Sequence, residues 1–196
     1  MTNKCAVAVI GLGIYGMSVL RELSQYLNGD VIGFDQYNPP HLFGSSHGDT
    51  RVTRLAIGEG RECTPLAIRS HQKWQELELF TGKSLYVPTG VLIMASPKEK
   101  SLHGNSNFLG ETKKAALEFK INHKRMNAKD IAKKYNQFNL IGDEEGYFEF
   151  DGGYIKPEEC IKAQKIVALK NGTRIITNTE IAKIIGPQFK RKDLMI

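Results

Sequence analysis

Residues 6–16, Ala-Val-Ala-Val-Ile-Gly-Leu-Gly-Ile-Tyr-Gly, decide how the N-terminal part of this chain folds. The first five are apolar, a run long enough for one buried strand and too short for a helix. Gly11, Gly13 and Gly16 follow at the spacing G-x-G-x-x-G, and apolar residues then recur at helical intervals. A second apolar run, 31–34, predicts another strand. The segment is therefore expected to form a strand–helix–strand unit with a glycine turn at its first corner.

Each glycine has a distinct role in such a corner. Gly11 permits the tight turn, Gly13 lets a pyrophosphate approach the backbone, and Gly16 lets the helix pack closely on the sheet. The free N–H groups at the helix start favour phosphate. Asp35 ends the second strand about 20 residues later, where a carboxylate accepts hydrogen bonds from both ribose hydroxyls and repels the 2′-phosphate of NADP. The pattern predicts an adenine dinucleotide site and leaves FAD and NAD open; the alternative is a glycine-rich corner without a ligand.

The composition is that of an ordinary globular protein. The 196 residues, 41% apolar and 24% charged, suffice for one domain or two small ones. No apolar stretch reaches the ~18 residues of a membrane span, and the chain enters a strand too early for a signal peptide. Cys5, Cys63 and Cys160 are too widely separated for a metal site. We expect reduced thiols, no membrane association and a cytoplasmic location.

The net charge of +6 raises the possibility of a nucleic-acid partner. The basic residues are concentrated at 113–134 and 190–192. In the first of these segments they alternate with acidic and apolar residues, as on a solvated helix face, and no aromatic RNA-binding signature accompanies them. We therefore expect no nucleic-acid partner.

The irregular segment 36–50 is the next candidate functional element. It contains two prolines, several glycines and serines, and the histidines His41 and His47. Fifteen residues without clear periodicity inside a compact domain are typical of a functional loop. The loop leaves the carboxyl end of the second predicted strand, which is the sheet edge where ligands bind in α/β proteins.

The segments 44–54 (Gly-Ser-Ser-His-Gly-Asp-Thr-Arg-Val-Thr-Arg) and 58–62 (Gly-Glu-Gly-Arg-Glu) closely resemble the monomeric sarcosine oxidase and N-methyltryptophan oxidase family. These are flavoenzymes of the D-amino-acid-oxidase-like group. The similarity extends to 34–41, 86–92 and 153–157, and so covers nearly the whole chain. It implies an α/β fold: a Rossmann-like FAD-binding domain with part of an interleaved α+β substrate domain.

The resemblance also implies a division of the chain. Residues 1–82 correspond to the first part of the FAD-binding domain, 83–152 to part of the substrate domain, and 153–196 to a return to the FAD-binding domain. Members of the family are considerably longer, so the chain is expected to represent an N-terminal half whose partner is a missing C-terminal half. The cysteine that binds flavin covalently in the family has no counterpart among the residues present.

Roles of individual residues follow from the resemblance alone. Arg51 corresponds to an arginine over the flavin ring, His47 to an active-site histidine, and Arg54 to an arginine that binds the substrate carboxylate. The positions that correspond to FAD contacts are Gly11, Gly13, Gly16, Asp35, Ser45, Ser46, Thr50 and Ile181.

These residue types suit the implied chemistry. A guanidinium stabilises the negative charge that a reduced flavin develops, and arginine binds a carboxylate in bidentate geometry. Arg51 and Arg54, three residues apart, are expected on one side of a turn. Histidine, the residue type at position 47, suits proton transfer, because the pKa of an imidazole is easily moved near 7. The residues alone also allow another interpretation: the arginines pair with Asp49 and Glu59 at the surface, while His47 caps a turn.

The resemblance implies oxidative demethylation of an N-methyl amino acid, such as sarcosine or N-methyltryptophan. Hydride would pass to FAD, the imine would hydrolyse to formaldehyde, and O₂ would become hydrogen peroxide. Alternatives are a related amine or imino-acid oxidase, or a non-catalytic dinucleotide-binding remnant. We expect the 196-residue chain to produce no peroxide on its own.

Periodicity and capping signals predict the remaining elements. We expect helices at 64–81, 107–119 and 157–170, and a short helix after a capping box at Asn127–Asp130. Strands are expected at 84–86, 91–94, 147–150, 174–177 and 180–185.

Overall fold

The computed structural model describes residues 4–96 and 107–186, so the basic segment 190–192 lies outside the described residues. The chain divides into two compact units. Unit 1 comprises residues 1–47 and 164–196, and unit 2 comprises residues 48–163. Each unit is described by itself.

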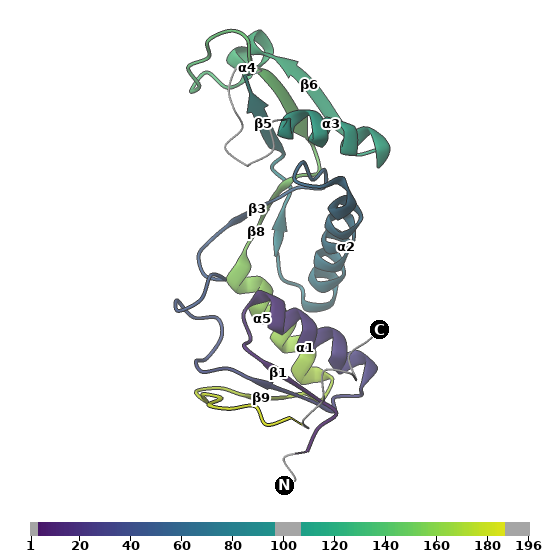
Figure 1. Cartoon of the computed structure of the whole chain (residues 1–196), viewed down its shortest axis with the longest axis vertical. Helices are drawn as coiled ribbons and strands as arrows, with labels where there is room; N and C mark the ends of the chain where they lie inside the picture. Colours follow the sequence, from purple (N-terminus) through teal and green to yellow (C-terminus); the bar gives the residue numbers. More distant parts are fainter. Residues whose placement is uncertain (1–3, 97–106, 187–196) are drawn as a thin grey trace. The chain divides into compact units, whose positions relative to one another are not determined.

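Unit 1 contains a parallel three-stranded sheet (Figure 1). Its strands are β1 (Val7–Ile10), β2 (Val31–Phe34) and β9 (Arg174–Ile176), in the order β1-β2-β9. Helix α1 (Ile14–Tyr26) connects β1 to β2 and buries Met17 and Leu20 completely. The predicted strand–helix–strand unit is confirmed.

The C-terminal ends of two helices meet in unit 1. Helix α5 (Pro157–Lys170) confirms the helix predicted at 157–170. It begins in unit 2 and ends in unit 1. Just beyond it, the Asn171 side-chain amide donates to the Ser24 hydroxyl at 3.0 Å. Gly29 lies so close to this segment that a Cβ there would come within 2.3 Å of the Asn171 carbonyl. This contact fixes α5 against the end of α1.

Unit 2 begins with an antiparallel sheet covered by a long helix. The sheet has the order β3-β8-β4, from β3 (Arg51–Thr53), β8 (Gly153–Ile155) and β4 (Tyr86–Val87). The short 3₁₀ helix η1 (Arg61–Cys63) leads into α2 (Thr64–Thr81), which has proline in its first turn and ends at Gly82 in the left-handed region, φ 68°. The predicted helix at 64–81 is confirmed, while the strand expected at 84–86 is shifted to β4.

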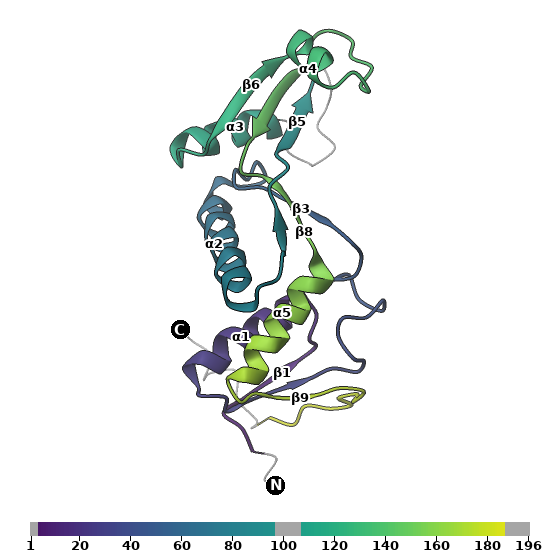
Figure 2. The ribbon, with the colours of Figure 1, turned by 180° about the vertical axis from the view of Figure 1, so that it is seen from behind.

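A second antiparallel sheet in unit 2 is covered on both faces (Figure 2). Its order is β5-β7-β6, from β5 (Val91–Ala95), β7 (Glu145–Glu149) and β6 (His123–Asn127). Side chains alternate across a strand, so neighbours in β7 enter different cores. Tyr147 packs with alanines of α3 (Phe108–Glu118), whereas Phe148 packs with Ile131 of α4 (Ala128–Lys134).

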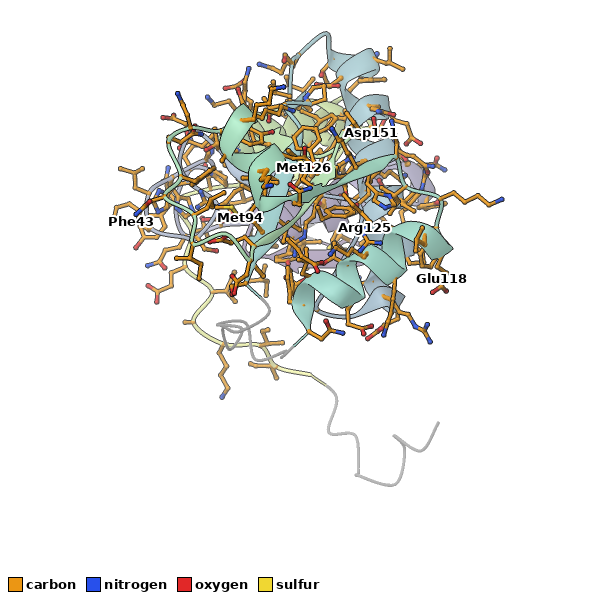
Figure 3. All side chains as sticks on the ribbon, turned by 90° about the horizontal axis from the view of Figure 1, so that it is seen from above. Phe43, Met94, Glu118, Arg125, Met126 and Asp151 are labelled. Carbon is orange, nitrogen blue, oxygen red and sulfur yellow. The ribbon has the colours of Figure 1, made fainter. Side chains whose placement is uncertain are left out.

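On the α4 side of this sheet, two methionines pack beneath the helix, and the helix begins with the predicted capping box. Met94 and Met126, labelled in Figure 3, both stand opposite Gly146 in register and belong to the core beneath α4. The predicted capping box is present: the Asp130 N–H donates to the Asn127 side chain at 2.9 Å, and the Asp130 carboxylate accepts from the Asn127 N–H.

Two local expectations were wrong. The segment 180–185 pairs with no strand among the described residues. Ile184 and Ile185 are 76% and 84% exposed. The segment forms no strand because a strand needs a neighbouring backbone to pair with, and none of the described strands lies beside it. Arg51 is not in a turn with Arg54 either, since it begins β3.

No helix within residues 4–96 and 107–186 is long and apolar enough to cross a membrane.

Candidate functional site

The glycine turn of unit 1 is closed by direct backbone contacts. Gly11 has φ +85°, a conformation that favours glycine, and its N–H donates to the Phe34 carbonyl at 2.8 Å. Gly16, in the first turn of α1, lies against the same residue. A Cβ on Gly16 would come within 1.8 Å of the Gly11 carbonyl oxygen. The start of the helix can approach the turn this closely only because residue 16 has no Cβ.

The loop after β2 folds back to the start of α1. Gly13 is the N-cap of that helix, and as a glycine it has no side chain to accept from the free N–H groups. The Ile14 N–H instead donates to the Ser46 hydroxyl at 3.1 Å. A Cβ on Gly13 would lie 3.3 Å from that hydroxyl. The structure thus brings Ser46 together with the glycine turn, while Ser45 is exposed beside it.

Asp35 links the end of β2 to the turn. It is 7% exposed, and its carboxylate accepts from the Leu12 N–H at 2.7 Å and from the Tyr37 N–H at 2.8 Å. The His41 imidazole lies 3.3 Å from the same carboxylate, and its ring packs against those of Tyr37 and Phe43. A carboxylate has about four acceptor positions, so these bonds leave capacity for a ribose hydroxyl.

Ile181 follows a segment that is bonded to Asp35. The Asp35 N–H donates to the Ile176 carbonyl and the Thr179 N–H donates to the Asp35 carbonyl, both at 3.0 Å. Ile181 is two residues further, half-buried and outside any strand. The backbone pairing, rather than a strand, brings this segment to the end of β2.

In unit 2, Arg51 extends from an exposed strand. Its side chain is exposed and donates to the carbonyl of Thr50, itself exposed, at 2.8 Å. The segment before it is held to α5, because the Gly48 N–H donates to the Glu158 carboxylate at 3.0 Å. His47 is half-buried and belongs to unit 1.

Arg54 binds a carboxylate of its own chain. Its Nη2 lies 2.7 Å from both carboxylate oxygens of Glu59. The guanidinium carbon is 5.5 Å from the centre of the Phe108 ring, a cation–π contact. Its buried Nε has no hydrogen-bond partner among the described residues. The pairing with Glu59 is the one that the residues alone suggested as an alternative.

The backbone that follows Arg54 is bonded to a buried carboxylate, Glu149, which was not predicted from the sequence. Glu149 is fully buried, and its side chain accepts from the Leu55 N–H at 2.5 Å, the Ala56 N–H at 3.0 Å and the Tyr147 hydroxyl at 2.8 Å. Burial and the neighbouring Glu149 charge raise the pKa of Tyr147 far above its usual range. The one available signal was a glutamate between two phenylalanines of an otherwise apolar strand.

A histidine and a tyrosine adjoin this region. The His71 Nε2 lies 2.8 Å from the Thr53 hydroxyl, and the His71 and Tyr86 rings are 5.0 Å apart. Burial lowers the pKa of His71, against the opposing effect of the Glu149 and Asp151 charges. Burial, together with nearby acidic groups, raises the pKa of Tyr86 to about 12. Both side chains are therefore neutral near pH 7.

A parallel strand–helix–strand unit with a glycine-rich corner and a carboxylate after its second strand defines the dinucleotide-binding class of α/β proteins. Within that class, residues 6–192 match the FAD dependent oxidoreductase family, DAO, and the chain belongs to this family.

Curated relatives confirm the resemblance. The chain is 35% identical over 181 residues to the monomeric sarcosine oxidase of Bacillus sp. (strain B-0618), covering 92% of this chain and 45% of that protein. It is 30% identical over 180 residues to the N-methyl-L-tryptophan oxidase of Yersinia pestis (strain Pestoides F), covering 92% and 46%. The chain thus spans less than half the length of these relatives.

Solved structures confirm the predicted fold class. NikD, described as an unusual amino acid oxidase essential for nikkomycin biosynthesis, gives a TM-score of 0.75 at 20% identity in its open form, over 90% of this chain and 44% of its own. Glycine oxidase from Bacillus cereus gives 0.69 at 20% identity, over 94% and 49%.

Proposed function

We propose that this chain supplies the FAD-binding unit and the carboxylate-binding arginine of an oxidase for N-methyl amino acids. Its reaction is oxidation at the CH–NH group of a substrate of the sarcosine or N-methyltryptophan type, with O₂ and water consumed and amino acid, formaldehyde and hydrogen peroxide formed. The observation that carries the proposal is the closed glycine turn, with Gly16 against Gly11 and Asp35 bonded to Leu12. The identities of the curated relatives support the substrate class.

The residues of unit 1 fit a dinucleotide. The N–H groups at the start of α1 suit a diphosphate, because they are not bonded within the helix and carry its positive dipole end. Asp35 suits a ribose diol, and Ser46 suits the region beside the diphosphate. Ser45, Thr50 and Ile181 are proposed as further FAD contacts. When bound, FAD supplies the hydride acceptor.

The residues of unit 2 fit an amino-acid substrate. Arg54 orients the carboxylate through charge-assisted hydrogen bonds, and its contact with Glu59 is an example of such binding within the chain. Arg51 supplies a positive charge that stabilises reduced flavin. His47, which belongs to unit 1, is proposed to exchange a proton with the substrate amine.

The test compares sarcosine with dimethylamine, which has the same N-methyl group and no carboxylate. Flavin absorbance of the FAD-loaded protein is followed during titration with each. We expect a saturable change with sarcosine, little change with dimethylamine, and loss of the sarcosine response in Arg54→Ala. An equal response to both compounds would refute the carboxylate-binding role.

A further inference from the structure

We propose that Glu149 is a positioning residue for Arg54. Its buried carboxylate fixes the backbone directly after Arg54 and thereby sets where the guanidinium meets a carboxylate ligand. The inference rests on the proposed function, since it assigns Glu149 a role through the substrate-binding arginine.

The clamp joins parts of the chain that are far apart in sequence. Glu149 lies at the end of β7, whereas Leu55 and Ala56 follow Arg54. One carboxylate oxygen accepts from the Leu55 N–H at 2.5 Å and the other from the Ala56 N–H at 3.0 Å. Two bonds to consecutive N–H groups define both the position and the direction of this backbone.

The energetics indicate a specific role for the charge. A buried carboxylate loses its hydration, which costs several kcal/mol unless donors replace the water. Here the two backbone N–H groups and the Tyr147 hydroxyl supply three donors, and Glu149 is 0% exposed. An apolar side chain would fill this place without that desolvation cost, so the carboxylate is best explained by what it holds.

Glu149 holds the backbone that connects Arg54 to Glu59. The clamped residues separate Arg54 from Glu59, and Ala56 is completely buried. The other side of this segment is also constrained, because a Cβ on Gly58 would come within 2.3 Å of the Thr112 hydroxyl in α3. With the backbone fixed on both sides, Arg54 presents its guanidinium from a defined base over the Phe108 ring.

The test uses Glu149→Gln, which keeps the shape of the side chain and replaces one acceptor oxygen with a donor. Glu144→Gln is the matched control. The Glu144 carboxylate also accepts from two backbone N–H groups, those of Ile141 at 2.7 Å and Gly142 at 2.9 Å, in an exposed turn away from Arg54. Glu149→Asp is the second variant, because it keeps the charge and is one methylene too short to hold both backbone N–H groups.

The first readout is the Arg54 Nε–H signal in the NMR spectrum of the 196-residue chain. We expect Glu149→Gln to broaden or shift this signal and to speed amide exchange at Leu55 and Ala56. Glu144→Gln should leave the Arg54 signal and the amide exchange of Leu55 and Ala56 unchanged. An unchanged Arg54 signal in a folded Glu149→Gln protein would overturn the inference.

The second readout is binding of acetate, a minimal carboxylate, followed at the same Arg54 signal. We expect Glu149→Gln to weaken acetate binding about tenfold, the equivalent of roughly one charge-assisted hydrogen bond. Unchanged acetate affinity would overturn the inference. If Glu149→Gln does not fold, Glu149→Asp decides: weaker acetate binding supports the inference, and unchanged affinity overturns it.

Arg54→Ala separates this inference from the proposed function, with acetate binding followed at the Leu55 and Ala56 amide signals, which every variant retains. If the alanine variant binds acetate as well as the parent chain, the carboxylate-binding role of Arg54 fails, whatever Glu149 does. If the alanine variant loses binding while Glu149→Gln retains it, only the positioning role fails.

Discussion

Arg54 and Glu59 form an ion pair in which one guanidinium nitrogen lies 2.7 Å from both carboxylate oxygens. The residue proposed to bind a substrate carboxylate therefore already binds one from its own loop. A substrate must displace Glu59, whose side chain is 54% exposed.

Glu59→Gln should consequently strengthen carboxylate binding at Arg54. Exposed ion pairs contribute about 0.2–1 kcal/mol, so we expect acetate affinity to rise by a factor of about 1.5–5. Acetate titration followed at the Arg54 Nε–H signal measures this. Glu118→Gln, which removes the exposed pair with Arg61, is the control and should have no effect. Weaker binding in Glu59→Gln would show that Glu59 assists the ligand rather than competing with it.

Gly16→Ala should destabilise unit 1 and abolish dinucleotide binding. The new Cβ would lie 1.8 Å from the Gly11 carbonyl, so the helix must move away from the turn, at a cost of about 1–3 kcal/mol or more. Thermal unfolding and FAD titration measure the two effects. Gly44→Ala is the control, because a Cβ there would make only an ordinary contact, 3.6 Å from the His41 ring. A Gly16→Ala protein as stable as Gly44→Ala would contradict the described packing.

Asp35→Ala should weaken both the fold of unit 1 and FAD binding. It removes the acceptor of the Leu12 and Tyr37 N–H groups, and hydrogen bonds to a charged group are worth about 1.5–3 kcal/mol each. Urea unfolding gives the stability change, and FAD titration under conditions where the variant is folded gives the binding change. Equal FAD retention in a folded Asp35→Ala protein would exclude the ribose-binding role.

His71 should make stability dependent on pH. Burial lowers its pKa from 6.5, so as the pH falls the unfolded chain takes up a proton before the folded one does. The stabilising contribution is complete above about pH 6.5 and is lost as the pH falls towards the lowered pKa of the folded state. The melting temperature measured from pH 7.5 to 5 should fall less in His71→Gln than in the parent chain. Equal slopes in His71→Gln and the parent chain would contradict the assignment.

Local patterns predicted the parts of the fold that depend on neighbours in sequence. The strand–helix–strand unit and the Asn127–Asp130 capping box follow from periodicity and spacing, and both are present. The strand expected at 180–185 is absent, because whether a segment pairs depends on a neighbouring strand that its own residues do not specify.

The candidate site was predictable only where its contacts are local. Arg54 and Glu59 are five residues apart, so their pairing was among the expected alternatives. The Ser46 contact with Ile14 joins residues 32 apart, and the Glu149 contact with Leu55 joins residues 94 apart. Contacts over such separations are set by the tertiary fold, and no residue pattern near Glu149 indicates its partners.

Unit 1 is proposed to form an FAD site, and direct titration tests this proposal best. The folded 196-residue chain is dialysed against FAD and, separately, against NAD. We predict saturable binding of one FAD per chain, weaker binding of NAD, and loss of FAD binding in Gly16→Ala, with Gly44→Ala unaffected. Preference for NAD, or a folded chain with no saturable FAD binding, would contradict the account.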